Sequence, residues 1–318
     1  MRKFPRPVVV LSQCLELAPC RYDGERIPFP FLRKLAAHVE LRPVCPEVEI
    51  GLGVPRDPIR VIERGGERTL LQPATGRDLT RAMRRFAEKF LGGLGGADGF
   101  ILKSRSPSCG IGDVKRYAGA EAAKPIGKGA GFFAEEALAR FPGLAVEDEA
   151  RLGNPLIRER FLTRLFALAR FRAVKERPSA AALARFQEAN RLLLLARHKR
   201  EAKALEKIAA NRKRRPLPEA MEEYERHLHA ALARPARRAS AADVLRQSVG
   251  AAGSPLRPSE RARFLRAIER YREGRAPLSA ALRPLRDWIG RDETLAGQTL
   301  FSPFPPDLED TGGESAIA

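Results

Sequence analysis

Two kinds of hydrophobic pattern alternate along the first half of the chain. Short apolar runs at 7–12, 39–44 and 98–103 are typical of buried strands. Between them, residues 29–39 and 76–91 carry apolar side chains at the spacing of an amphipathic helix. Strands that alternate with helices predict an α/β fold with a mainly parallel sheet and crossover helices.

Two more elements are predicted in this half. Residues 59–63 and 68–72 flank a pair of glycines, Gly65 and Gly66, which is the pattern of a β-hairpin. Residues near 132–140 again show helical spacing. We therefore expect strand, helix, strand, hairpin, helix, strand and helix in that order.

From Asn154 onward the strand pattern disappears, and apolar residues recur at helical spacing. Proline- and glycine-containing breaks lie at 177–179, 215–218, 250–258 and 274–277. These breaks predict about six helices. We expect an α/β domain at residues 1–150 and an all-helical domain at residues 151–318, ending in an extended or disordered tail from Pro303 to Ala318.

Charge is distributed unevenly over the 318 residues. Residues 1–150 contain 24 Lys and Arg against 19 Asp and Glu, whereas residues 151–318 contain 34 against 20, so most of the net charge of +19 belongs to the second half. This asymmetry favours a polyanionic partner, with nucleic acid first and an anionic membrane surface second. A helical domain that is simply rich in alanine and arginine has the same composition.

Other features of the sequence limit the class of protein. No apolar run approaches the roughly 20 residues that cross a bilayer, and the first residues lack the apolar stretch of a signal peptide. We therefore expect a cytoplasmic protein without a membrane partner. Four cysteines are too few for a disulfide scaffold, which favours metal binding or catalysis, or burial as small apolar residues.

Three of the cysteines, Cys14, Cys45 and Cys109, each follow a predicted strand. Because the carboxyl ends of parallel strands meet at one edge of a sheet, we expect these thiols to lie at the same edge. Three thiolates suit an iron–sulfur cluster or a zinc ion, and a set of three leaves one metal position open. Three roles are open for Cys20: a fourth ligand, a loop residue packed against the sheet, or an additional redox-active thiol. We favour a role outside the ligand set.

Polar groups near these cysteines are candidates for catalysis. Glu47 follows Cys45 by two residues, where it suits general acid/base catalysis or the start of a helix. Ser106 and Ser108 lie beside Cys109, either as catalytic hydroxyls or as turn residues.

Several basic residues and a glycine-rich stretch also lie near the predicted site. Two interpretations are open for the basic residues Lys103, Arg105 and Arg56: they hold an anionic substrate, or they are solvated charges at the rim. The stretch Gly127-Lys128-Gly129-Ala130-Gly131 forms an active-site loop or a plain turn. It lacks the spacing of a dinucleotide-binding loop, so we expect no nucleotide cofactor.

Three segments carry a family resemblance. They are Ser12-Gln13-Cys14-Leu15 with Arg21-Tyr22-Asp23-Gly24, Cys45-Pro46-Glu47 with Gly51-Leu52-Gly53-Val54-Pro55-Arg56, and Leu102-Lys103-x-x-Ser106-Pro107-Ser108-Cys109-Gly110. In this order they resemble the motifs of the thiouracil desulfidase family, over roughly residues 7–150. The second half is similar to the helical YbgA-type domain that is fused to this module in bacterial 4-thiouridine desulfidases acting on tRNA.

The resemblance implies a [4Fe-4S] cluster held by Cys14, Cys45 and Cys109, with an open fourth iron that binds the thiocarbonyl sulfur. It implies that Glu47 transfers protons and that Ser106 polarises the substrate. Water would replace the sulfur, and hydrosulfide would leave without net redox change. The further substrate contacts that we predict are Ser108, Lys103, Arg56 and Arg21.

Three basic clusters in the second half supply charge for RNA phosphates. The predicted RNA-binding residues are Arg197, Lys199, Arg200, Arg212, Lys213, Arg214, Arg215, Arg237 and Arg238. The partner would be thiolated tRNA. A histidine-rich stretch usual in the helical family is mostly replaced here, and only His198 remains. The alternatives are a desulfidase of free thiouracil, a non-catalytic metal-stabilised RNA-binding protein with Cys20 as fourth ligand, and an enzyme that inserts sulfur.

Overall fold

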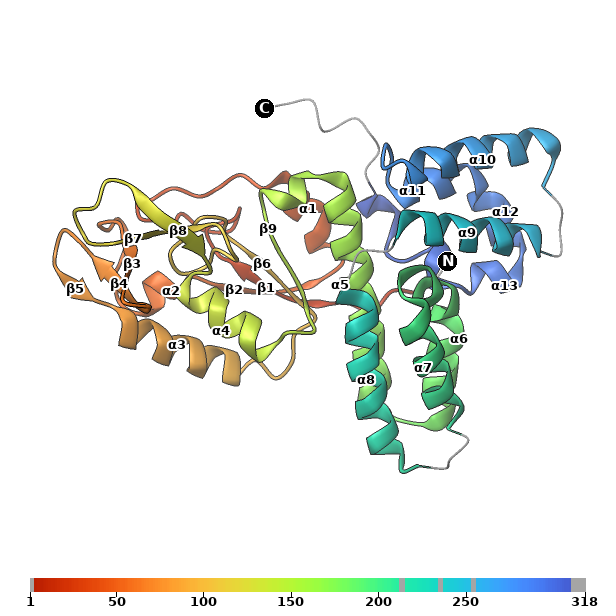
Figure 1. Ribbon diagram of the computed structural model, residues 1–318, viewed down its shortest axis with the longest axis horizontal. Helices are drawn as coiled ribbons and strands as arrows, with labels where there is room; N and C mark the ends of the chain where they lie inside the picture. Colours follow the sequence, from red (N-terminus) through yellow and green to blue (C-terminus); the bar gives the residue numbers. More distant parts are fainter. Residues whose placement is uncertain (1–2, 212–214, 234–236, 253–255, 310–318) are drawn as a thin grey trace. The chain divides into compact units, whose positions relative to one another are not determined.

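The computed structural model describes residues 3–211, 215–233, 237–252 and 256–309 (Figure 1). The chain divides into two compact units. The N-terminal unit comprises Arg6–Gly153, and the helical unit comprises the chain from Asn154 onward together with the residues before Arg6. Among the described residues, no helix is both long and apolar enough to span a membrane.

A four-stranded parallel sheet lies at the centre of the N-terminal unit. Its strands are β1 (Val8–Ser12), β2 (Glu40–Val44), β6 (Gly99–Leu102) and β9 (Ala145–Asp148), in the order β2-β1-β6-β9. Every residue of β1 and β6 is buried, which is why both appear in the sequence as continuous apolar runs. The predicted α/β fold with a mainly parallel sheet is confirmed.

A second sheet of five strands was not predicted. It contains β3 (Arg60–Arg64), β4 (Glu67–Gln72), β5 (Arg77–Asp78), β7 (Val114–Tyr117) and β8 (Pro125–Gly129), in the order β5-β4-β3-β7-β8. The predicted hairpin is β3 and β4, but it belongs to this sheet, in which three of the four pairings are antiparallel. The residues of β7 and β8 are mostly polar or glycine, so they gave no strand signal.

The helices of the N-terminal unit are α1 (Pro30–Ala36), α2 (Pro46–Glu49), α3 (Thr80–Gly92) and α4 (Phe132–Arg140). Helices α3 and α4 lie side by side (Figure 1). Between them Phe133 stacks on Phe86 at 6.2 Å and packs against Phe90 at 5.8 Å between ring centroids. The loop between β6 and β7, residues 103–113, is called the cysteine loop below. It packs against this core through Cys109.

In the described part of the helical unit there are six long helices and three short ones. They are α5 (Pro155–Glu176), α6 (Ala180–Arg197), α7 (Lys199–Ala210), α8 (Leu217–Ala233), α9 (Arg238–Gly250), α10 (Pro258–Arg272), α11 (Leu278–Leu282), α12 (Arg286–Arg291) and α13 (Glu293–Ala296). About six were predicted, but the boundary between α6 and α7 falls at His198, where no break was predicted. Side-chain oxygens of Asn154 and Ser179 cap α5 and α6.

The start of the expected tail is folded. Phe304 and Leu308 are each only 2% exposed, and a turn of 3₁₀ helix covers Pro306–Leu308. These apolar side chains anchor the segment on the helical unit, so the predicted extended tail is wrong for 303–309. Residues 310–318 lie outside the described residues.

Candidate active site

Three cysteines stand at the carboxyl ends of neighbouring parallel strands. Cys14 lies two residues after β1, Cys45 follows β2 directly and begins α2, and Cys109 lies in the loop after β6. Strand β1 pairs in parallel with both β2 and β6, so the three chain segments leave the sheet at one edge. All three are buried free thiols, and they line one cavity of about 470 Å³.

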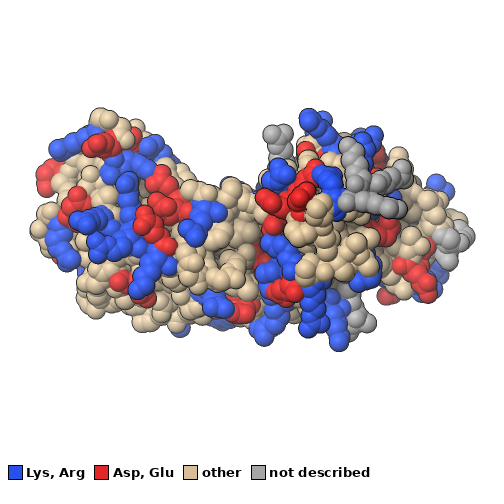
Figure 2. Space-filling view, turned by 90° about the horizontal axis from the view of Figure 1, so that it is seen from below, with Lys and Arg blue, Asp and Glu red and all other residues tan. Residues whose placement is uncertain are grey.

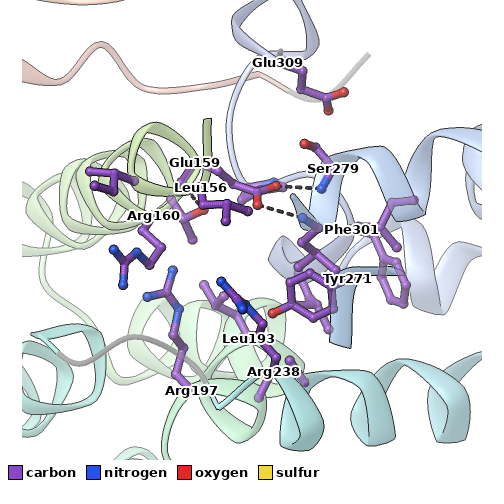
Figure 3. A pocket seen from close by; sticks show the side chains of 18 of the residues that line it. Leu156, Glu159, Arg160, Leu193, Arg197, Arg238, Tyr271, Ser279, Phe301 and Glu309 are labelled. Carbon is purple, nitrogen blue, oxygen red and sulfur yellow. Dashed lines mark hydrogen bonds between the residues drawn. The ribbon is translucent and has the colours of Figure 1, made fainter. Parts of the chain in front are cut away.

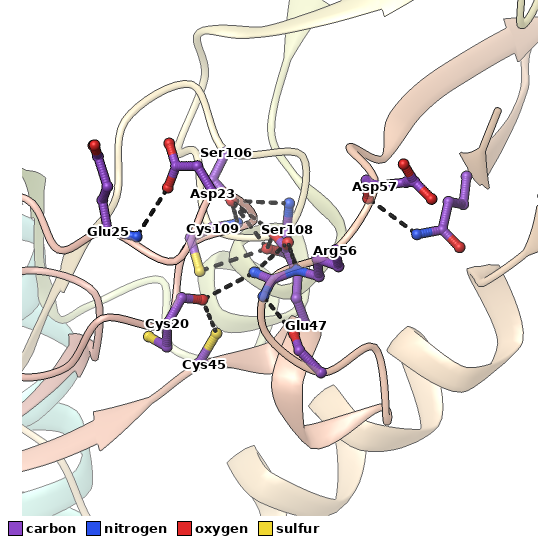
Figure 4. Close-up of polar contacts among 12 residues, drawn as sticks. Cys20, Asp23, Glu25, Cys45, Glu47, Arg56, Asp57, Ser106, Ser108 and Cys109 are labelled. Carbon is purple, nitrogen blue, oxygen red and sulfur yellow. Dashed lines mark hydrogen bonds and ion pairs between the residues drawn. The ribbon is translucent and has the colours of Figure 1, made fainter. Parts of the chain in front are cut away.

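Cys20 lines the same cavity and packs with Cys14 and Cys45. The thiol of Cys45 lies 3.6 Å from the carbonyl oxygen of Cys20 (Figure 4). A hydrogen bond with Cys14 raises the pKa of the Cys20 thiol to about 11. The sequence favoured a role for Cys20 outside the ligand set, whereas the structure places its thiol beside two of the predicted ligands.

The thiols of Cys45 and Cys109 are also shifted towards their neutral forms. The hydrogen bond with Cys20, and then burial, raises the pKa of Cys45. Burial raises the pKa of Cys109 to about 12. Because metals bind the thiolate, any metal at this site must displace these protons.

Glu47, on α2, is the centre of a polar network (Figure 4). One carboxylate oxygen accepts hydrogen bonds from Nε and Nη2 of Arg56, at 3.0 and 2.8 Å. The other accepts from the hydroxyl of Ser108 at 2.7 Å and from that of Ser106 at 3.4 Å. The side chains of Glu47 and Arg56 are only 12% and 4% exposed, so water screens this two-point ion pair weakly.

Arg56 also connects Glu47 with the cysteines. Its Nη2 donates to the carbonyl oxygen of Cys20 at 3.1 Å, and its Nη1 donates to that of Gly53 at 2.9 Å. The sequence predicted Arg56 as a substrate contact. In the structure Arg56 lines the cavity, but its guanidinium is engaged by protein acceptors on three sides.

The two serines of the cysteine loop make hydrogen bonds both within the loop and to Glu47. The hydroxyl of Ser106 accepts hydrogen bonds from the backbone N–H groups of Cys109 and Ser108, at 3.1 and 3.3 Å. It also lies 2.9 Å from the hydroxyl of Ser108. Ser106 therefore holds the turn that positions Cys109, while the Ser108 hydroxyl is directed at Glu47.

The glycine-rich stretch before α4 serves the same loop. The N–H groups of Gly131, Phe132 and Ala134 donate to carbonyl oxygens of the cysteine loop at 2.8–3.1 Å. A Cβ atom on Gly131 would lie 2.6 Å from the carbonyl oxygens of Pro107 and Ser108. The first turn of α4 is thus bound by protein carbonyls, which leaves its N–H groups no role in holding a phosphate.

Two predicted substrate contacts are ion-paired at the cavity wall. The ammonium of Lys103 lies 2.6 Å from a carboxylate oxygen of Glu149. Arg21 pairs with Asp23 at 2.9 Å. Both basic residues line the cavity, with their charges already compensated.

Other wall residues were missed in the sequence. Tyr117, on β7, and Arg60, on β3, line the cavity together, and the guanidinium carbon of Arg60 lies 4.8 Å from the centroid of the Tyr117 ring. This pair forms a flat surface of the kind that stacks on heterocycles. Tyr22, within a family-like motif, also lines the cavity, and its position in that motif was the available signal. No such signal in the sequence indicated Tyr117, because the other residues of its strand are mostly polar.

The donor set fits an iron–sulfur cluster. The cysteines line one cavity, and in a cluster each cysteine binds a different iron. Soft thiol ligands are also those that iron–sulfur clusters take.

The predicted RNA contacts are dispersed. Four of them are exposed: Lys199 and Arg200 at the start of α7, Arg237 before α9, and Arg238, which begins α9. Arg197 and the exposed Arg238 also line a cavity of the helical unit. Arg215 forms an ion pair with Glu223, and Arg212, Lys213 and Arg214 lie outside the described residues. Figure 2 shows Lys and Arg over one face of both units, interspersed with acidic side chains.

Comparisons with known proteins cover both units. Residues 9–149 match the family model described as 2-thiouracil desulfurase, and residues 191–305 match a model described as a protein of unknown function, DUF1722. The uncharacterized protein YbbK of Bacillus subtilis (strain 168) is 33% identical over 156 residues, which are 47% of this chain and all of YbbK.

A solved structure, described as the [4Fe-4S]-dependent thiouracil desulfidase TudS, is 33% identical and covers 46% of this chain and 93% of its own, with a TM-score of 0.38. The family model and the full-length match to YbbK both fall on the unit that contains the four cysteines. Through this N-terminal unit, the chain belongs to the 2-thiouracil desulfurase family.

Proposed function

We propose that the protein removes sulfur from 4-thiouridine in tRNA, using a [4Fe-4S] cluster held by Cys14, Cys45 and Cys109. The observation that carries this proposal is the convergence of three strand-end thiols and the Glu47 network on one cavity. The family model supports desulfidation of a thiolated pyrimidine. The basic helical unit supports a polyanionic substrate.

The chemistry exchanges sulfur for oxygen. Water adds to the thiocarbonyl carbon, the C–S bond breaks, and hydrosulfide leaves, so no electrons are transferred. When bound, the cluster would supply a Lewis acid for the sulfur atom. The protein residues then have two tasks, to move protons and to hold the planar base.

In this proposal Glu47 carries the proton transfer. Its Oε1 atom, the acceptor of the Ser108 hydroxyl, takes one proton from the attacking water and returns it to the leaving sulfur, and the second proton passes from the added hydroxyl to solvent as the carbonyl forms. Arg56 holds the opposite oxygen and leaves Oε1 turned to the serines. Ser108 keeps its hydrogen bond to Glu47, whereas the hydroxyl of Ser106, whose bond to Glu47 is long at 3.4 Å, turns to donate to the base. The Arg60–Tyr117 surface supports the flat face of the base.

The decisive experiment compares two substrates on the anaerobically reconstituted protein. We expect loss of the thiocarbonyl absorbance of 4-thiouridine in tRNA, with hydrosulfide released in equal amount. Turnover of free thiouracil but not of thiolated tRNA would show that the substrate is the free base. Failure with both would overturn the desulfidase proposal, and incorporation of sulfur into unmodified tRNA would reverse its direction.

Cysteine variants test the ligand set. We expect Cys14→Ser, Cys45→Ser and Cys109→Ser each to lose reconstituted iron and its visible absorbance, whereas Cys20→Ser retains both. Cys20→Ser is the matched control, since it is also buried and lines the same cavity. Iron loss in Cys20→Ser would show four-cysteine ligation and would remove the open metal position.

A further inference from the structure

A second cavity, of about 620 Å³, lies within the helical unit (Figure 3). All of its lining residues belong to that unit, on α5, α6, α9, α10, α11 and the segment from Leu300 to Glu309. Its volume is in the range of about 300–1,000 Å³ that is usual for small-molecule sites. None of the residues proposed for desulfidation lines it.

Three arginines reach this cavity from three helices. Arg160 comes from α5, Arg197 is the last residue of α6, and Arg238 is the first residue of α9 (Figure 3). Gly274, at the end of α10, leaves the room that Arg238 occupies, since a Cβ atom there would come within 1.9 Å of Nη1. An anion bound between these guanidinium groups would interact favourably with all three.

The acidic side chains of the wall have strong donors of their own. The carboxylate of Glu159 accepts hydrogen bonds from the backbone N–H groups of Leu278 and Ser279, at 2.7 and 2.6 Å. Glu309 forms an ion pair with Arg286, which does not line the cavity. Burial raises the pKa of both carboxyl groups, and the hydrogen bonds to Glu159 and the positive charge of Arg286 beside Glu309 act in the opposite direction.

Most of the remaining wall is apolar or aromatic, and its polar members are Asn154, Thr163 and Ser279. Leu193 and Phe301 are buried residues of the cavity wall, and Tyr271 is only 7% exposed. Figure 3 shows the Tyr271 hydroxyl directed towards Arg238. Because burial raises the pKa of Tyr271, this hydroxyl is a neutral hydrogen-bond donor beside the arginines. The cavity therefore combines a cationic end with a flat apolar side.

We propose that this cavity binds a nucleotide through its phosphate monoester. The phosphate lies between Arg160, Arg197 and Arg238, and the base packs against Leu193 and Phe301. Guanidinium forks match phosphate oxygens in pairs, and a monoester carries up to about two negative charges near neutral pH, which suits three arginines better than a carboxylate does. The nucleotide is either free in solution or the 5′ end of an RNA chain. This binding goes beyond desulfidation and needs no cluster.

Calorimetric titration of the full-length protein tests the proposal with uridine 5′-monophosphate, uridine and inorganic phosphate. We expect the monophosphate to bind at least tenfold more tightly than either fragment. Arg160→Gln and Arg197→Gln should each weaken it at least tenfold. Arg266→Gln is the matched control, because Arg266 is exposed on α10 and does not line the cavity. Equal binding of uridine and its monophosphate, no binding at all, or unchanged binding in the cavity variants would overturn the proposal.

Short single-stranded RNAs with and without a 5′-phosphate distinguish the two sources. Displacement of the monophosphate by the 5′-phosphorylated RNA alone assigns the site to an RNA end, and displacement by neither assigns it to the free nucleotide. Equal displacement by both RNAs would overturn recognition of a monoester. Thermal unfolding checks each variant, and if Arg197→Gln does not fold, Arg160→Gln decides the result.

Discussion

At the scale of single residues, the orientation of Glu47 depends on Arg56. Removing the guanidinium of Arg56 leaves one carboxylate oxygen of Glu47 without its two donors. It also breaks the hydrogen bond to the carbonyl oxygen of Cys20. We expect Arg56→Gln to lower kcat for the thiolated base by about 10–100-fold, the usual effect of losing a partner that orients a site residue, with KM nearly unchanged. Steady-state kinetics measure both. A raised KM with normal kcat would instead support the sequence-based prediction of a substrate contact.

Glu16 stabilises the loop between Cys14 and Cys20. It accepts hydrogen bonds from the N–H of Phe29 and from Arg33, and these bonds lower the pKa of its carboxyl below 4.5. Because the pKa is lower in the folded state than in the unfolded state, the charged carboxyl adds to the free energy of unfolding. This contribution is complete well above pH 4.5 and is lost as the pH falls through the folded-state pKa.

We therefore expect Glu16→Gln to lower the free energy of unfolding at pH 7 by about 1 kcal/mol, a typical hydrogen-bond contribution. The difference from the unchanged protein should shrink towards pH 3, because the native carboxyl is then increasingly protonated. Urea unfolding at both pH values provides the measurement. An equal difference at both would show that the charge of Glu16 does not contribute.

At the scale of elements, the first turn of α4 and the cysteine loop form one hydrogen-bonded block. In Gly131→Ala the new Cβ atom meets backbone oxygens at 2.6 Å, and a backbone shifts less easily than a side chain. We expect a loss of about 1–3 kcal/mol in unfolding free energy, as for overpacked sites, with a fall in desulfidase activity.

Gly112→Ala is the control, since nothing lies within 4 Å of its Cβ position. It should keep both the stability and the activity. Chemical unfolding and turnover of the thiolated base are the two measurements. If Gly131→Ala behaved like Gly112→Ala, the contact between α4 and the loop would be dispensable.

Two of the three strands that lead to the cysteines, β1 and β6, were predictable because they are buried on both faces, whereas β2 is mostly exposed. β1 and β6 are continuous apolar runs, and parallel pairing then brings Cys14, Cys45 and Cys109 to one edge. The strand β7 was not predictable, because its residues are mostly half-buried or exposed and polar, and so Tyr117 was missed. The pairing of Glu47 with Arg56 depends on tertiary contacts that no sequence spacing encodes.

Neighbouring basic residues of one cluster separate in the structure. A run of basic residues at a helix end points in several directions. Lys199 and Arg200 are exposed, while Arg197, two residues before Lys199, lines the cavity of the helical unit. Charge in sequence therefore favours a polyanionic partner but does not select the side chains that would bind it.

At the scale of the whole molecule, the two units differ in net charge. If the helical unit, which carries most of the positive charge, contacts tRNA phosphates, the KM for thiolated tRNA should rise about tenfold between 50 and 200 mM salt, as expected when a few phosphate contacts are lost. Turnover of free thiouracil should be nearly constant over that range. Parallel kinetics on the two substrates provide the measurement, and the same salt response for both would argue against phosphate contacts.

The backbone bonds from α4 to the cysteine loop also bear on how the proposed cluster would be assembled. Gly131, Phe132 and Ala134 bind that loop, and Ser106 ties the turn before Cys109. Because these bonds join protein groups, they would hold the loop without the cluster, unlike the metal-dependent fold of a zinc finger. Assembly would then be the delivery of iron and sulfide to a folded acceptor, and a chelator would remove the iron without unfolding the protein.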